Sequence, residues 1–167
     1  MLEDSLVSAC RDGNTAALIS CLQQPTADVN VVTAGGGLLH HAVSAGHTHM
    51  VSLLLSHPCI QPNLQDPAGL TAVHLACSQG RDKLVRMMIK SETVNVDINK
   101  PCYQWFNPLL TAAMAGHRFC VSALLSSKFL NLNVTWQGMS AETLASRNGH
   151  KKIAKIIQVR VCIAYAK

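Results

Sequence analysis

The stretch that decides the fold reads Gly69-Leu70-Thr71-Ala72-Val73-His74-Leu75-Ala76-Cys77-Ser78-Gln79-Gly80. Its closing glycine recurs at spacings of 33, 34, 36 and 33 residues, as Gly13, Gly46, Gly80, Gly116 and Gly149. An alanine stands four residues before each of these glycines, as Ala9, Ala42, Ala76, Ala112 and Ala145. Self-similarity at a period of this size is typical of a stacked repeat array.

Each copy also contains a second apolar segment after its glycine. A histidine follows the glycine directly in three copies, as His47, His117 and His150. Aliphatic residues then recur at the spacing of one helix face, as in Met50, Val51, Leu54 and Leu55 or in Leu84, Val85, Met88 and Ile89. Each copy therefore predicts two short helices joined by a turn. We call the first helix of each copy the inner helix and the second the outer helix. Inner helices are expected near 38–45, 72–79, 108–115 and 141–148, and outer helices near 48–56, 82–91, 118–127 and 151–158.

The repeated unit resembles the ankyrin repeat, whose signature is Thr-Pro-Leu-His-x-Ala at a period of about 33 residues. The stretch from Gly69 to Gly80 shows it most clearly, and the other copies keep it as Gly37-Leu38-Leu39-His40-His41-Ala42, Asn107-Pro108-Leu109-Leu110-Thr111-Ala112 and, most loosely, Gly138-Met139-Ser140-Ala141-Glu142-Thr143-Leu144-Ala145. The family's Asp-Val-Asn stretch before each hairpin is marked by Asn30, Asn63, Asn99 and Asn133. The resemblance covers nearly the whole chain. It implies an all-α solenoid of stacked helix-turn-helix units with short β-hairpin loops.

The spacing divides the chain into an ankyrin-repeat domain over residues 1–158 and a tail over 159–167. The repeats are expected near 3–33, 34–66, 67–102, 103–135 and 136–158. The spacing of 36 residues places extra residues at 90–99, where we expect a longer loop. In the tail, Val159, Val161, Ile163 and Tyr165 alternate with other residues, which is a strand-like period. Either this tail folds back over the fifth repeat, or further chain covers it.

The resemblance also assigns roles to the repeated residues. The glycine is expected just after the inner helix, where the backbone turns left-handed at little cost. His40 and His74 stand where the family uses a histidine to tie turns together by hydrogen bonds. Leu110 and Thr143 replace this histidine in the fourth and fifth copies. We therefore expect the C-terminal end of the array to be the weaker end and to unfold first.

Composition narrows the class of protein. Of the 167 residues, 49% are hydrophobic, but no stretch approaches the roughly 18 uninterrupted apolar residues that span a bilayer. The acidic start, Met1 to Ser5, lacks the basic region of a signal peptide. The seven cysteines are scattered and odd in number, which favours buried free thiols in a reducing compartment. We therefore expect a cytoplasmic or nuclear protein and a monomer.

Catalytic and metal-binding patterns are missing from the sequence. His47, His49 and His57 form the densest histidine group, but there is no Cys-x-x-Cys pair and no structural zinc spacing. The glycine run 35–37 lacks the Gly-Lys-Ser/Thr ending of a phosphate-binding loop. We expect no enzyme activity, no cofactor, no metal and no small-molecule substrate.

Function is therefore expected on a surface that binds a protein or peptide partner. Solenoids present extended concave surfaces, and in ankyrin-like proteins the contacts come from the hairpin tips and the exposed end of the inner helix. Aromatic and methionine side chains gather in the fourth and fifth hairpins, as is typical of binding hot spots. The predicted contact residues are Leu70, Gln79, Tyr103, Gln104, Phe106, Met114, Trp136, Gln137, Met139 and Arg147. Trp105 stands at the hairpin-glycine position; it and Phe106 are either contact residues or structural cover for the fourth repeat.

Two other functions stay open at this point. The chain could be the targeting part of a larger protein, such as a ubiquitin-ligase substrate receptor, a kinase or a channel. It could also bind a polyanion or nucleic acid, because the formal net charge is +5 and Arg147, Lys151, Lys152, Lys155, Arg160 and Lys167 lie near the C-terminus. No aromatic interleaving supports nucleic-acid binding, and these lysines fit the solvated side of an amphipathic helix.

Overall fold

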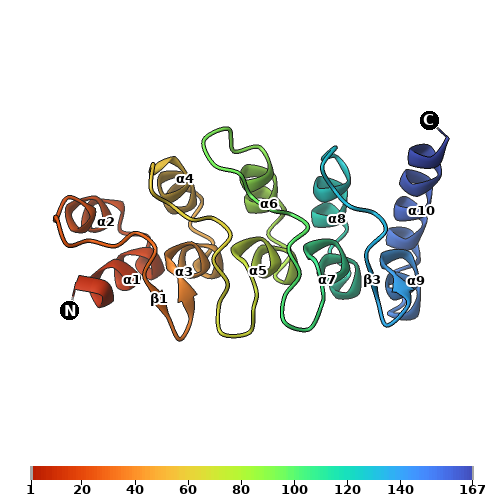
Figure 1. Cartoon of the computed structure of the whole chain (residues 1–167), viewed down its shortest axis with the longest axis horizontal. Coiled ribbons are helices and arrows are strands. Elements are labelled where there is room, and N and C mark those ends of the chain that lie inside the picture. The colour runs from red at the N-terminus through yellow and green to blue at the C-terminus, as the bar shows by residue number, and fades with distance from the viewer. Residues whose placement is uncertain (1, 167) are drawn as a thin grey trace.

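The computed structural model describes residues 2–166, and within them ten helices stack as five pairs in a row (Figure 1). The first helix of each pair is the inner one: α1 (Leu2–Asp12), α3 (Leu38–Ala45), α5 (Ala72–Ser78), α7 (Pro108–Ala115) and α9 (Ala141–Arg147). The second is the outer one: α2 (Thr15–Leu22), α4 (Thr48–Ser56), α6 (Asp82–Ile89), α8 (Arg118–Leu125) and α10 (Lys151–Tyr165). The all-α solenoid expected from the sequence is therefore confirmed.

The expected helices are present, and the largest difference lies at the C-terminus. The predicted outer helix near 151–158 continues to Tyr165, so the strand-like interpretation of the tail is wrong. Val159, Val161 and Ile163 lie in a helical extension whose polar side chains bond to the end of α8 and to the loop that follows it. Arg160 Nε donates a hydrogen bond to the carbonyl oxygen of Leu125 over 3.1 Å, and the Tyr165 hydroxyl donates one to Asn133 Oδ1.

Short hairpins connect the repeats on one side of the array. Strands β1 (Val32–Thr33) and β2 (Gly36–Gly37) pair antiparallel, as do β3 (Thr135–Trp136) and β4 (Met139–Ser140). The third and fourth repeats have turns at the corresponding places, at residues 66–70 and 102–106. We call these the third and fourth hairpins, and the pair β3 and β4 is the fifth. The first of these turns is closed by a bond from the Asp66 amide to the Leu70 carbonyl, and the second by one from Cys102 to Phe106.

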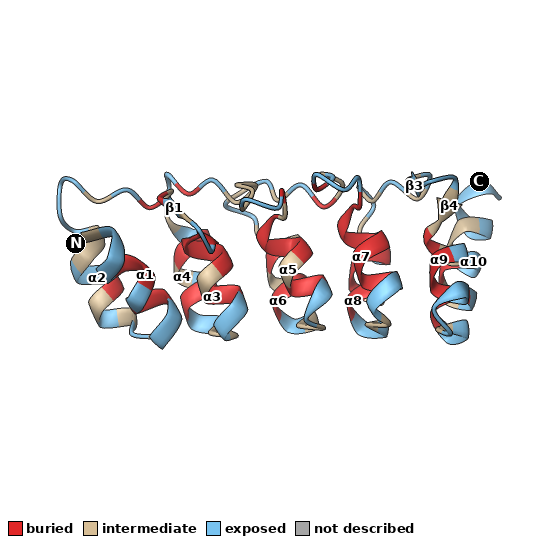
Figure 2. Ribbon diagram, turned by 90° about the horizontal axis from the view of Figure 1, so that it is seen from below, coloured by how far each residue is buried: buried red, intermediate tan, exposed pale blue. Residues whose placement is uncertain are grey.

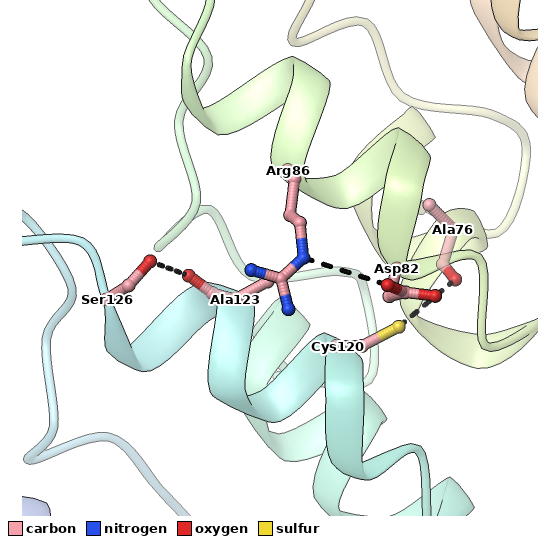
Figure 3. A network of polar contacts seen from close by, with 6 residues as sticks. All are labelled: Ala76, Asp82, Arg86, Cys120, Ala123 and Ser126. Atoms are coloured by element: carbon pink, nitrogen blue, oxygen red, sulfur yellow. Dashed lines mark hydrogen bonds and ion pairs between the residues drawn. The ribbon is translucent and has the colours of Figure 1, made fainter.

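The core lies between the inner and outer helices and between neighbouring pairs. Ala42, Ala76, Ala112 and Ala145 are completely buried, which allows adjacent inner helices to approach closely. Figure 2 shows the buried residues gathered in the parts of the helices nearest the loops and the exposed residues at the opposite helix ends. Cys120 of α8 is buried, and its thiol lies 4.0 Å from the carbonyl oxygen of Ala76 in the preceding repeat (Figure 3).

Each repeated glycine has the expected left-handed backbone, and most have a second constraint. Gly80, for example, has a φ of +70°, and a Cβ atom built on it would lie 2.6 Å from Nδ1 of His117 in the next repeat. The imidazole of His117 crosses this glycine to donate from Nε2 to the Ser78 carbonyl oxygen over 2.9 Å. His47 and His150 make the equivalent bonds to Arg11 and Met114. In the third repeat Arg81 replaces the histidine and donates to the Ser44 carbonyl oxygen over 2.6 Å.

A ladder of asparagine side chains joins the loops that lead from each outer helix to the next hairpin. Asn30 donates from Nδ2 to the Cys59 carbonyl and accepts at Oδ1 from the Gln61 amide, over 2.8 and 2.7 Å. Asn63 and Asn99 make the same pair of bonds to the loops that follow them. The last asparagine in this register, Asn133, has Tyr165 of α10 in place of a following loop. The extension of α10 thus ends the ladder.

Candidate partner-binding surface

The fourth hairpin presents the largest exposed aromatic side chains of the candidate surface. Tyr103 is 66% exposed and Trp105 is 73% exposed, with exposed Gln104 between them. One side of Tyr103 packs on the backbone of the third hairpin, where a Cβ atom on Gly69 would lie 2.5 Å from the ring. Tyr103 is therefore positioned by its neighbour while most of its surface faces solvent.

Trp105 takes the place and the backbone conformation of a hairpin glycine. Its φ is +66°, close to the +78° of Gly69 in the preceding repeat. A left-handed conformation costs an L-residue about 1–2 kcal/mol, and for a bulky residue it is uncommon. Because the side chain is 73% exposed, burial does little to offset this cost. Of the two interpretations of Trp105, structural cover is therefore wrong, because the indole does not fold down.

Phe106 is the residue that covers the fourth repeat. It is buried, at 8% exposure, and its carbonyl oxygen accepts a hydrogen bond from His74. Trp136 is half-buried and stacks on it, with ring centroids 4.8 Å apart and ring planes tilted by 30°. The ring of Phe106 fills the gap between two hairpins, which favours structural cover over a contact role for this residue. Trp136 therefore packs against Phe106 and stays partly exposed.

The remaining predicted residues differ in how far they are accessible. Gln137 is exposed at the tip of the fifth hairpin with a φ of +51°, and Met114 is 41% exposed at the end of α7. Met139 is half-buried, and its sulfur lies 2.8 Å from Nη1 of exposed Arg147. In the third repeat, Gln79 is exposed, and Leu70 is half-buried.

We give the name aromatic surface to a set of seven residues: Tyr103, Gln104, Trp105, Met114, Trp136, Gln137 and Arg147. It lies on the hairpin and inner-helix side of the fourth and fifth repeats. The sequence indicates the left-handed turn at Trp105 in one way only: Trp105 stands at the repeat position that Gly69 holds in the third repeat. No formal charge other than that of Arg147 belongs to these residues, so apolar contact is the main source of binding energy that they offer.

Two observations on the described residues concern metal binding and thiol chemistry. Among residues 2–166, no group of three or more His, Cys, Asp and Glu side chains is placed to hold a metal ion. Burial raises the pKa of the Cys10 thiol to about 12, which keeps it in the unreactive protonated form. Over the same residues, no helix has the length and apolar character needed to cross a membrane.

Comparison with known proteins agrees with this architecture. The sequence model of the family described as "Ankyrin repeats (3 copies)" matches residues 6–102 and 94–161. A probable E3 ubiquitin-protein ligase of rice, XBOS32, is 30% identical over 139 residues, which are 81% of this chain and 27% of the ligase. The human transient receptor potential cation channel subfamily A member 1 is 28% identical over 71% of this chain and 11% of its own length. Mouse Rabankyrin-5 is 33% identical over 45% of this chain and 6% of its own length.

These relatives are much longer than the present sequence, which spans about a quarter of the rice protein and about a tenth of the channel. The match to the family model extends over nearly all of the described helices. The chain belongs to the ankyrin-repeat family.

Proposed function

We propose that this chain is a non-catalytic interaction module that binds a protein or peptide partner through the aromatic surface. The observation that carries the proposal is Trp105, a large indole held 73% exposed in a backbone conformation that favours glycine. Outliers of this kind occur where function requires a side chain that stability does not. Tyr103 beside it and Met114 on α7 add the residue types that are enriched at binding hot spots.

The aromatic surface fits an extended or hairpin segment of a partner better than a small molecule. Its residues come from two neighbouring hairpins and the ends of α7 and α9, so they form a broad surface. The central contacts would be Tyr103 and Trp105. Arg147 at the edge could pair with an acidic group on the partner, which would add orientation more than affinity.

We also propose that the module works as a monomer in a reducing compartment, the cytoplasm or the nucleus. Support for the reducing compartment comes from the thiols: Cys10, Cys77, Cys102 and Cys120 are buried and form no disulfide bond among the described residues.

A second candidate function is that the chain is the targeting part of a longer protein. Support for it is the length of its relatives, which include a ubiquitin ligase and a channel.

Site-specific photo-crosslinking of the intact chain tests the proposed surface. A photoreactive amino acid is placed at Gln104 or Gln137, or at exposed Ser52 on α4 as the matched control. We expect the same captured protein to crosslink from positions 104 and 137 and not from 52. Crosslinking from 52 alone would place the partner on the outer helices and would contradict the proposal.

A further inference from the structure

A second surface lies on the outer-helix side, between α8 and α10. Its floor is formed by Leu125 of α8 and by Ile156, Val159 and Ile163 of α10. Lys152, Ile156, Val159 and Ile163 follow one another at spacings of four, three and four residues, so they form a single stripe along α10. The depression is open and continuous, because its two parts share Ile156 and Val159. We call it the α8/α10 groove.

The apolar floor is not a requirement of the repeat. The position of Val159 is held by Ser56, Lys90 and Ser126 in the second, third and fourth repeats. Val159 is 51% exposed and Ile163 is 49% exposed, whereas the buried residues Ile153, Ala154 and Ile157 attach α10 to the array. Compared with the outer helices of the second, third and fourth repeats, α10 therefore adds exposed apolar side chains, Val159 and Ile163, to its packing face.

The rim of the groove is strongly basic. Arg118, Lys152 and Lys155 line one end of it. Residues 100–166 contain eight lysines and arginines but a single acidic residue, Glu142 on the inner helix α9. None of these three rim residues has an ion-pair partner among the described residues.

The third repeat shows how an outer helix balances its own charge. Arg86 of α6 lies 3.7 Å from Asp82, one turn earlier on the same helix (Figure 3). The two corresponding positions of α10 are both basic, Lys151 and Lys155. The positive charge on α10 therefore has no internal neutralisation, and a negatively charged occupant would gain from it.

We propose that the α8/α10 groove binds an acidic amphipathic helix of a protein partner. An apolar stripe on such a helix would cover Val159 and Ile163, and its flanking carboxylates would meet Arg118, Lys152 and Lys155. A second copy of this chain is a poor occupant, because two grooves with basic rims would repel each other. A further repeat would pack on the side of α10 that faces away from α8 and would leave the groove open. A nucleic acid could match the rim but gains nothing from the aliphatic floor.

Binding of a defined peptide tests this proposal. The probe is a labelled helical peptide of about 18 residues, five turns long, with leucine at every third or fourth position and glutamate elsewhere. Fluorescence anisotropy measures its affinity for the intact chain. We expect saturable binding that weakens with salt and a loss of about tenfold for Val159→Ser, which installs the residue of the second and fourth repeats. We expect a similar or larger loss for Lys152→Glu combined with Lys155→Glu.

Matched controls separate the groove from general charge attraction and from the aromatic surface. Lys83→Glu changes the exposed lysine of α6 that corresponds to Lys152, and Trp105→Gly changes the other surface; both should bind the peptide as the wild type does. A peptide of the same composition without the leucine stripe should bind much more weakly. Absence of saturable binding, or equal binding of both peptides, would overturn the proposal. It would equally be overturned if single-stranded DNA or anionic phospholipid vesicles bound with a dependence on the lysines and the leucine-stripe peptide did not.

Discussion

His74 of the third repeat hydrogen-bonds to the carbonyl oxygen of Phe106 in the fourth, with Nε2 3.0 Å from that oxygen. Its other ring nitrogen, Nδ1, accepts from the backbone amide of Thr71 over 3.2 Å. An amide can only donate and a carbonyl can only accept, so the neutral Nε2–H tautomer is the one that satisfies both partners. His40 makes the same pair of bonds, to Gly37 and to Leu70 of the following repeat.

The first prediction is that acid weakens the array through these two histidines. Burial lowers the pKa of His40 and of His74, and it acts in the same direction on His41. The histidines of the unfolded chain take up protons near pH 6.5, whereas those of the folded chain do so only at lower pH. The free energy of unfolding therefore keeps its full value above about pH 6.5 and falls as the pH drops through the folded pKa values. Urea unfolding at about pH 7.5 and about pH 5.5 measures the loss.

His74→Leu is the matched variant for this prediction, because Leu110 occupies the same position in the fourth repeat. We expect it to lower the free energy of unfolding by about 1–3 kcal/mol for each buried polar group that is left unpaired. It should also flatten the dependence on pH. An unchanged pH dependence would show that the buried histidine does not carry the effect.

The second prediction separates two reasons for the repeated glycine. Gly80 and Gly149 both have a left-handed backbone, with φ of +70° and +84°, but only Gly80 is crossed by a neighbouring imidazole. Gly149→Ala should destabilise by about 1–2 kcal/mol through backbone strain alone. Gly80→Ala should cost clearly more, because the added methyl displaces His117. Equal losses in thermal or urea unfolding would mean that the contact with His117 contributes nothing.

The third prediction concerns the order of unfolding. The fourth repeat lacks the histidine bond, and the buried Nδ2 of Asn107 has no hydrogen-bond partner among the described residues. We expect amides of α9 and α10 to exchange faster than those of α5 and α6 in native-state hydrogen exchange. Tyr165→Phe removes the bond to Asn133 and should speed exchange in α10 further while leaving α5 unchanged. Slower exchange in the fifth repeat than in the third would contradict the weak C-terminal end.

The register of alanine, glycine and aliphatic residues was enough to predict the fold, because each of these residues has a local role. Ala76 is small where two inner helices meet, and the glycine after each inner helix or turn has a positive φ. The helical extension of α10 could not be predicted in this way. Its β-branched residues alternate like those of a strand, and its stability depends on contacts with Leu125 and Asn133, which are 35 and 32 residues away in sequence.

The candidate site stays a prediction, and the sequence does not determine how its side chains are oriented. Neighbouring aromatics Trp105 and Phe106 have similar apolar character, and only the turn decides that one ring is exposed and the other buried. The stacking of Trp136 on Phe106 likewise depends on how two hairpins lie side by side. The bonds that His47, His117 and His150 make to the preceding repeat were not foreseen, although their regular spacing was visible.

Paired measurements on Trp105→Gly test the central claim most directly, that the aromatic surface binds a partner. Relief of backbone strain, about 1–2 kcal/mol, exceeds the added chain entropy of glycine, about 0.5–1 kcal/mol, so the variant should be slightly more stable than the wild type. Its affinity for the captured partner should fall by about 2 kcal/mol, or thirtyfold. Phe129→Ala, which removes an equally exposed aromatic from another loop, should bind normally. A less stable variant with unchanged affinity would show that Trp105 is a structural residue and would contradict the account.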